Sequence, residues 1–364
     1  MNFNEHVVFD RLIKFIFGQD KLYADTKGRV KIMFRDKLYN KKISIFLLCL
    51  LLISFSNILG CGGKSPAPSG LDIQKSSGNR FPLTVTDDLG RKVTLKAEPA
   101  RLISVSPSHT EILFALGLGE RVVGVTKYCN YPAEAQSREI IGGFSDPNLE
   151  KIVAMKPDLV LATTDKHQNL IQGLDNAGVP VLAFSPNNID EIMKTIMLIG
   201  QATGSVGQAE VLTASLKERI DAVIAKVKNI PEDKRPRVYY EMYYAPLMSV
   251  GPGSLMGELI EKAGGKNVAG DAKEVYPQLS EELIISRNPQ VMLNTYTHGI
   301  QSVTTIEQIA HRQGWEDLSF VKSGRIYTLN ADLTDRSGPR VAEALESIAQ
   351  VLYPELFGKT LDGK

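Results

Sequence analysis

The chain has 364 residues, and its 42 basic and 41 acidic side chains leave a formal net charge of +1. The charge is unevenly distributed, since residues 61–364 carry 32 basic and 36 acidic side chains. This part of the sequence has no Lys/Arg cluster, which argues against a nucleic-acid partner. Of the three cysteines, only Cys129 lies well inside that region. We therefore expect a domain held by core packing, without an internal disulfide.

A hydrophobic segment near the N-terminus indicates export. Lys41 and Lys42 precede an apolar run over 43–55. Residues 58–60 follow as a short cleavage-site segment that ends in a small residue directly before Cys61. This order is typical of a secretory signal. A cysteine at that position resembles the lipobox of bacterial lipoproteins, in which Cys61 is lipidated and becomes the first mature residue; a plain transmembrane anchor is the alternative. Either way, we expect the rest of the chain outside the cytoplasm, in the periplasm or on the outer face of the cell membrane.

The segments flanking this signal are expected to lie outside the folded domain. Translation can begin at Met1 or Met33, and Met33 is favoured because it gives a signal of ordinary length. Residues 1–32 of the 1–60 leader are then either untranslated or an extra cytoplasmic extension. Residues 61–80 are rich in Gly, Ser and Pro, which predicts a flexible tether.

From residue 81 the pattern changes to alternating short strands and helices. A hairpin is predicted from 83–87 and 92–95, followed by strands at 102–105, 122–125, 159–162 and 179–184. Helices are predicted at 107–116 and 148–155, the first with the capping box Ser108-x-x-Glu111. Such alternation favours a parallel α/β sheet, which we assign to an N-terminal lobe at 81–204.

One long helical period separates this lobe from a second α/β series. Apolar residues recur at helical spacing over 206–227, which predicts a linking helix within 205–229; a surface helix of a single domain is the alternative. The C-terminal lobe, 230–358, is expected to contain strands at 238–240, 291–294 and 326–329, with helices at 254–263, 281–286 and 339–352.

Two segments of the second lobe repeat segments of the first. Residues 149–163 (LEKIVAMKPDLVLAT) align without gaps on 281–295 (EELIISRNPQVMLNT). Residues 111–117 likewise align on 258–264. Two repeats in the same order on either side of one long helix predict two similar lobes, and a cleft between lobes is a favoured place for a ligand.

Four segments carry a resemblance to a known family: 101–111 (RLISVSPSHTE), 124–132 (GVTKYCNYP), 148–158 (NLEKIVAMKPD) and 276–280 (YPQLS). They resemble the class III periplasmic binding proteins, the ABC-importer proteins for corrinoids, ferric siderophores and haem, and within that class the vitamin B12 binders. The resemblance covers about Phe81 to Leu352. It implies two Rossmann-like lobes joined by one long helix, and an extracytoplasmic monomer that delivers a corrinoid to permease and ATPase subunits. A ferric siderophore or haem is the alternative ligand.

The resemblance also implies docking residues. In the family, one glutamate on each lobe binds arginines of the permease. The first maps onto Glu111, and the second onto Glu258, favoured by the internal repeat, or Glu261, favoured by the spacing in the vitamin B12 binders. For each glutamate, an ordinary solvated charge is the alternative.

Ligand contacts are implied in the same way. Corrinoid binders pack aromatic side chains on the macrocycle, because a rigid apolar face gives contact area at low entropic cost. Tyr128 and Tyr276 match family aromatics, and Phe144 stands where a tryptophan is usual. Thr163 and Met242 replace other family aromatics, for which Tyr243 and Tyr244 compensate. Arg336, in the loop before the last helix, is expected to contact polar groups of the ligand.

Other functions receive little support. A zinc- or manganese-type receptor needs about three histidines with a carboxylate, whereas residues after Cys61 contain four scattered histidines and no His-x-His pair. A single histidine, His167 or His298, is a candidate ligand for cobalt or haem iron. We find no Walker loop, G-x-S-x-G or H-E-x-x-H motif, so no enzymatic activity and no resident cofactor are expected.

Overall fold

The computed structural model describes residues 23–24, 30–31, 81–295 and 305–358. Cys61, the export signal, the tether and His298 lie outside the described residues. Residues 1–72 form one unit, in which β1 (Tyr23–Ala24) pairs antiparallel with β2 (Val30–Lys31). Residues 73–364 form a second compact unit, which contains both predicted lobes. In the described part of the chain, no helix has the length and apolar character needed to cross a bilayer.

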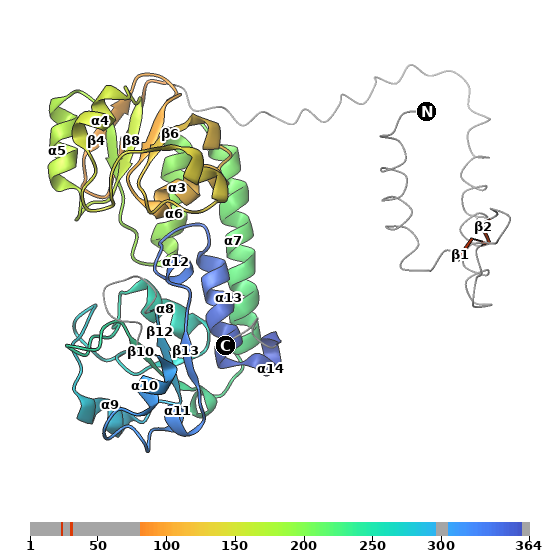
Figure 1. Cartoon of the computed structure of the whole chain (residues 1–364). Helices are drawn as coiled ribbons and strands as arrows, with labels where there is room; N and C mark the ends of the chain where they lie inside the picture. Colours follow the sequence, from red (N-terminus) through yellow and green to blue (C-terminus); the bar gives the residue numbers. More distant parts are fainter. Residues whose placement is uncertain (1–22, 25–29, 32–80, 296–304, 359–364) are drawn as a thin grey trace. The chain divides into compact units, whose positions relative to one another are not determined.

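The N-terminal lobe, the upper lobe in Figure 1, is built on a parallel sheet. Its five strands lie in the order β7-β6-β5-β8-β9. Its inner strands are buried throughout or nearly so, as expected for a parallel sheet covered on both faces. The strands are β5 (Leu102–Ser104), β6 (Val122–Val125), β7 (Glu139–Ile140), β8 (Leu159–Ala162) and β9 (Val181–Ala183). The connecting helices are α3 (Pro107–Ala115), α4 (Leu149–Ala154) and α5 (Gln168–Asn176).

The C-terminal lobe has a four-stranded parallel sheet in the order β11-β10-β12-β13. Its strands are β10 (Arg237–Glu241), β11 (Lys266–Asn267), β12 (Val291–Asn294) and β13 (Ile326–Thr328). Its helices are α8 (Leu255–Lys262), α9 (Glu281–Arg287), α10 (Ile306–Ala310), α11 (Ser319–Lys322), α12 (Ala331–Thr334), α13 (Val341–Leu352) and α14 (Pro354–Phe357). The predicted parallel α/β series is therefore confirmed in both lobes.

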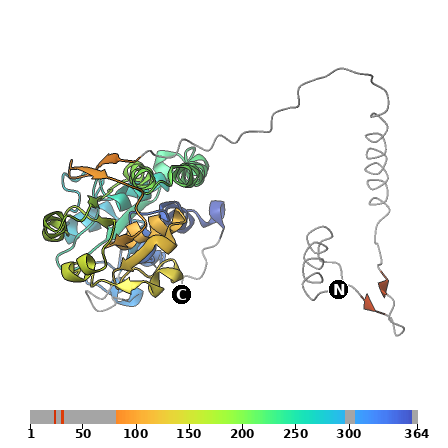
Figure 2. The same cartoon turned by 90° about the horizontal axis from the view of Figure 1, so that it is seen from above.

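Two helices connect the lobes. The predicted long helix is α7 (Val206–Val227), and it packs beside α6 (Ile189–Ala202), which the sequence patterns did not predict. Figure 2 shows these helices nearly end-on, with the hairpin of β3 (Leu83–Thr86) and β4 (Lys92–Leu95) packed against α6. Short 3₁₀ turns occupy Gly119–Arg121, Ala133–Ser137 and Glu232–Lys234.

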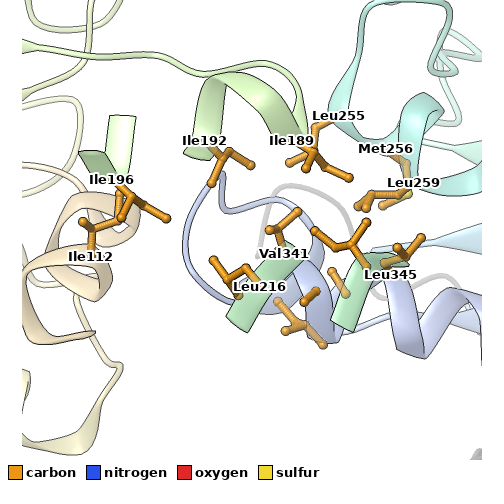
Figure 3. Packing of buried hydrophobic residues seen from close by; sticks show 14 of the residues in the cluster. Ile112, Ile189, Ile192, Ile196, Leu216, Leu255, Met256, Leu259, Val341 and Leu345 are labelled. Atoms are coloured by element: carbon orange, nitrogen blue, oxygen red, sulfur yellow. The ribbon is translucent and has the colours of Figure 1, made fainter. Parts of the chain in front are cut away.

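One hydrophobic core runs through both lobes. Ile112 of α3 packs near Ile196 of α6, and the cluster continues past Leu216 of α7 and Val341 of α13 to Leu259 of α8 (Figure 3). All five side chains are nearly or fully buried. Because close-packed interiors resist deformation, relative movement of the lobes must displace these buried contacts. The connection is thus stiffer than a loop hinge.

The internal repeat is visible in the backbone. The pair α4–β8 occupies the same relative positions as α9–β12, and each helix starts at a capping side chain, Asn148 in one lobe and Ser280 in the other. At matching positions after the helices, Lys156 and Asn288 both adopt left-handed backbone angles, with φ of 50° and 40°. Such angles are uncommon for residues other than glycine. The two units therefore share one turn geometry as well as one sequence pattern.

The predicted capping box at Ser108-x-x-Glu111 is wrong. Helix α3 begins at Pro107, as predicted, but its N-cap residue is Ser106 and not Ser108, and no side chain caps the helix. The Ser108 hydroxyl instead lies 2.9 Å from that of Ser106. The Glu111 carboxylate turns away from its own helix start and pairs with arginines of the other lobe.

Candidate functional site

A cavity of about 440 Å³ lies at the carboxyl ends of β10 and β12. In the second sheet, the strand order reverses between the adjacent strands β10 and β12. Open α/β sheets bind ligands at such a topological switch point. All but one of the lining residues come from the second lobe, and Asn187 is the exception. The lining consists of Asn187, Tyr240, Met242, Tyr243, Val250, Ser254, Leu255, Met256, Tyr276, Thr295, Thr334, Asp335 and Ser337.

Hydroxyl groups and one carboxylate form the polar part of this lining. The Tyr240 hydroxyl lies 2.8 Å from Thr295 Oγ1, which donates to Asp335 Oδ2 at 3.2 Å. Thr334 Oγ1 donates to the other carboxylate oxygen, also at 3.2 Å. Burial, with the nearby Asp335 charge, raises the pKa of the Tyr240 hydroxyl, which therefore stays protonated. The cavity thus joins hydrogen-bonding groups to apolar and aromatic surface, the usual composition of a small-molecule site.

A buried ion pair supports the wall of the cavity. Glu241, the last residue of β10, accepts two hydrogen bonds from Arg312 at 2.6 and 2.8 Å, and a third from the Tyr239 hydroxyl at 2.9 Å. Burial raises the pKa of Glu241, while Arg312 opposes that shift. The Arg312 guanidinium stacks 3.8 Å from the centre of the Tyr244 ring. Tyr244 therefore rests on this pair and does not line the cavity.

The predicted aromatic contacts do not converge on one cavity. Tyr243 and Tyr276 line it, whereas Tyr128 and Phe144 lie on the first lobe outside its lining. Tyr128 and Tyr276 are about equally exposed, at 51% and 48%. Phe144 packs edge-on against His167, with ring centres 5.1 Å apart. Ligand contact by any of these residues stays a prediction.

His167 is already hydrogen-bonded at both ring nitrogens. Its Nδ1 accepts from the Thr163 backbone N–H at 3.0 Å, so the proton sits on Nε2, which donates to the Phe144 carbonyl at 2.6 Å. A ring used in this way has no lone pair left for a metal ion. The suggestion that His167 ligates cobalt or haem iron is therefore wrong for this arrangement.

Arg336 and Glu111 lie together in an inter-lobe network, away from the cavity lining. The Glu111 carboxylate is fully buried and pairs with Arg336 Nη1 at 2.8 Å and Arg340 Nη2 at 2.7 Å. A docking carboxylate must be accessible to a partner, so this structure contradicts the exposure that docking through Glu111 requires. The Arg336 side chain faces the first lobe and does not line the cavity, so ligand contact by Arg336 stays a prediction.

The other two proposed docking residues differ from each other. Glu258 is half-buried, where its Oε2 accepts from the backbone N–H of Ile189 at 2.8 Å and Oε1 lies 3.5 Å from Lys262 Nζ. It thereby ties α8 to the start of α6. Glu261 is exposed on the next turn of α8. Docking through either residue stays a prediction.

His109 makes stability dependent on pH. Burial, together with the nearby His167, lowers the pKa of His109 from 6.5 to about 4. Because the folded state favours the neutral ring, the contribution of His109 to the free energy of unfolding is complete above pH 6.5 and is lost as pH falls toward 4. We expect the free energy of unfolding, measured with urea, to fall between pH 7 and pH 4.5. This fall should be larger by about 2–3 kcal/mol in the unmodified protein than in His109→Leu. Equal losses in both proteins would contradict this assignment.

The sequence interpretation missed several lining residues, although a signal for some of them was present. Tyr240 and Thr295 stand at or just after the ends of two predicted strands. Applying the rule that ligands bind beyond the carboxyl ends of parallel strands would have selected both. Asp335 lies beside Arg336, and only the structure shows that the first faces the cavity while the second faces the other lobe.

Comparisons with known proteins agree with this architecture. A family model described as periplasmic binding protein matches residues 102–333. The chain is 34% identical over 312 residues to an uncharacterised ABC transporter substrate-binding lipoprotein of Bacillus subtilis, covering 84% of this chain and 96% of that protein. It is 28% identical over 311 residues to a cobalamin-binding protein of Halobacterium salinarum, covering 84% of each. A solved structure of a possible iron-binding periplasmic protein of Staphylococcus epidermidis matches with a TM-score of 0.64 and 31% identity, covering 71% of this chain and 100% of that one.

Proposed function

We infer that this chain, which belongs to the periplasmic binding protein family, captures a corrinoid of the vitamin B12 type and delivers it to an ABC permease. Proteins of this family are substrate-binding components of ABC transporters, work with permease and ATPase subunits, and are not enzymes. Anchoring through a lipid on Cys61 is part of the same proposal.

The observation that carries the corrinoid proposal is the cavity with its aromatic and amphipathic lining. Tyr276 and Tyr243 offer flat faces to a macrocycle, and Met242 and Met256 supply adaptable apolar contacts. The hydroxyls of Tyr240 and Thr295 suit the amide groups that surround a corrin ring. The similarity to a cobalamin-binding protein supports the same ligand. A ferric siderophore is the second candidate, favoured by the likeness to a possible iron-binding protein.

Titration calorimetry on the full chain in mild detergent tests this proposal. Cyanocobalamin should bind one to one, and Tyr276→Ala should weaken its binding by about ten- to thirtyfold, the loss usual for a central aromatic contact. Tyr131→Ala is the matched control, because Tyr131 is equally exposed, at 47%, but does not line the cavity. Its affinity should stay within about twofold of the unmodified protein. Binding of a ferric siderophore but not cyanocobalamin would select the second candidate.

For the permease we propose a different pair of docking carboxylates, Glu150 and Glu282. The internal repeat places Glu150 of α4 on Glu282 of α9, and both side chains are exposed. Figure 1 places α4 and α9 in the two lobes, on the side away from α7. Bonds from its own backbone and from Ser280 lower the pKa of Glu282, which therefore carries its charge at neutral pH. Equivalent exposed charges on equivalent helices are what a partner that contacts both lobes requires.

A further inference from the structure

The lobes hold each other at a second place, apart from the connecting helices α6 and α7. Glu111 of α3 is buried and binds two side chains of the other lobe, Arg336 and Arg340, which are only 12% and 14% exposed. The Arg340 guanidinium also lies 4.1 Å from the centre of the Tyr131 ring in the first lobe. A buried carboxylate costs much free energy when it loses its cations, so this contact opposes separation of the lobes.

Asn130, in the loop after β6, adds a second set of contacts between the lobes. Its Oδ1 accepts from Arg336 Nη1 at 2.8 Å, and its Nδ2 donates to Asp332 Oδ2 at 2.7 Å. Arg336 Nη2 also donates to the backbone carbonyl of Tyr128 at 3.3 Å. The inter-lobe network therefore consists of Glu111 and Asn130 from the first lobe and Asp332, Arg336 and Arg340 from the second.

The two backbones meet beside this network. Gly338 is buried against the start of α3, where an ideal Cβ atom built on it would lie 3.7 Å from the Cβ of Ser108. The same position is 3.5 Å from the Ser108 backbone oxygen, which is an ordinary van der Waals distance. Figure 1 places α12, which directly precedes this loop, between the two lobes. The lobes are therefore in direct contact at this point.

The loop that carries the network is also a wall of the cavity. Thr334 and Ser337 line the cavity, whereas Arg336, between them in the chain, is bound by the first lobe. The first-lobe loop that Arg336 holds carries Tyr128, a predicted ligand contact. Parting of the lobes would therefore move one wall of the cavity away from Tyr128.

We propose that the inter-lobe network is a latch that holds the lobes together, so that ligand enters and leaves the cleft only when the latch opens. The consequence for ligand exchange rests on the proposed function as a binding protein. Because opening precedes both entry and release, a weaker latch raises both rate constants by a similar factor and changes the affinity little. Glu111 and Asn130 are then positioning residues, which act through Arg336 and Arg340.

Labelling of Gly338→Cys tests the latch without any ligand. A cysteine at this position is covered by Ser108 and should react with iodoacetamide only when the lobes part. In the full chain in mild detergent, adding Asn130→Ala should speed this labelling about tenfold, because it removes two hydrogen bonds to charged groups and leaves no buried charge unpaired. Mass spectrometry reads the label at residue 338 separately from the buried Cys129.

Further variants make the labelling test decisive. Gln136→Ala is the matched control, because Gln136 donates to the Asn130 carbonyl within the first lobe, and labelling should stay within about twofold. Glu111→Gln should speed labelling more than Asn130→Ala, since Arg336 and Arg340 both lose a buried counter-charge. Circular dichroism checks that each variant is folded. Unchanged labelling in the folded variants of Asn130 and Glu111 overturns the proposal.

A disulfide tests whether the latch controls ligand exchange. Ser108→Cys with Gly338→Cys should form a bridge on mild oxidation, because a Cβ–Cβ distance of 3.7 Å suits a disulfide. Stopped-flow spectra should show cyanocobalamin binding and release slowed about tenfold or more in the oxidised protein, and restored by reduction. Equal rates in both forms, or no bridge, overturn the proposal. Absence of cyanocobalamin binding would refute the corrinoid function, and labelling at residue 338 would still decide the latch.

Discussion

Replacing Glu241 by alanine is expected to lower the free energy of unfolding by about 3–5 kcal/mol, because it leaves the nearly buried Arg312 without its counter-charge. The loss should also reach the cavity, since Glu241 directly precedes Met242 and Tyr243, and Arg312 carries the Tyr244 ring. Urea unfolding followed by circular dichroism measures the first effect. Titration of the ligand measures the second, which should be a weaker affinity even at temperatures where the variant is folded.

A second glutamate–arginine pair provides the matched control. Arg219 of α7 binds Glu346 of α13 with the same two-bond geometry, at 2.8 and 2.6 Å, but these side chains are 42% and 39% exposed. Glu346→Ala should therefore cost less than about 1 kcal/mol. Glu241→Leu combined with Arg312→Met should recover much of the stability lost in Glu241→Ala, because no buried charge remains. Equal costs for Glu241→Ala and Glu346→Ala would contradict the role of burial.

Strands buried on both faces and helices of strong period were predictable from sequence. The bounds of β6, β8 and α7 coincide with the predicted 122–125, 159–162 and 206–227, because burial there depends on local apolar runs. Helix α6 was missed although its sequence also carries a helical period, because Ile189, Ile192, Ile196 and Ile199 all lie on its buried face. Short helices such as α10 and α12 depend on tertiary contacts and carry little periodic signal.

The candidate site was less predictable, because its contacts connect distant parts of the chain. Glu111 matches the capping-box pattern locally, yet the guanidinium that binds it comes from a residue 225 positions later. No local pattern reports such a partner. Resemblance supplied Tyr276 and Tyr243, whereas Thr295 and Asp335 enter the lining through the packing of β12 and α12. The internal repeat aligns Glu150 with Glu282. Only the structure shows that both of these side chains are exposed whereas Glu111 is buried, which makes the aligned pair the better candidate for docking.

Reversing the charge of Glu150 and Glu282 together, each to arginine, should abolish ligand uptake while leaving ligand affinity unchanged. Both side chains are exposed at the first turn of their helices and away from the cavity lining, so neither folding nor capture should suffer. Like charges brought together at a docking surface oppose association strongly, and two such contacts should weaken docking by about a hundredfold or more. Uptake is measured in cells that depend on this protein, and affinity by titration of the purified variant.

Glu281 supplies the control for this experiment. It is exposed beside Glu282 on α9, but the internal repeat pairs it with Leu149, so a partner that treats both lobes alike has no use for its charge. Glu281→Arg changes the net charge of α9 by the same amount as Glu282→Arg and should leave uptake within about twofold. Each single reversal at Glu150 or Glu282 should give an intermediate loss, because one lobe still docks. Normal uptake by the double variant would remove both residues from the interface, and equal loss from Glu281→Arg would indicate that the general charge of this surface, and not the repeated pair, governs docking.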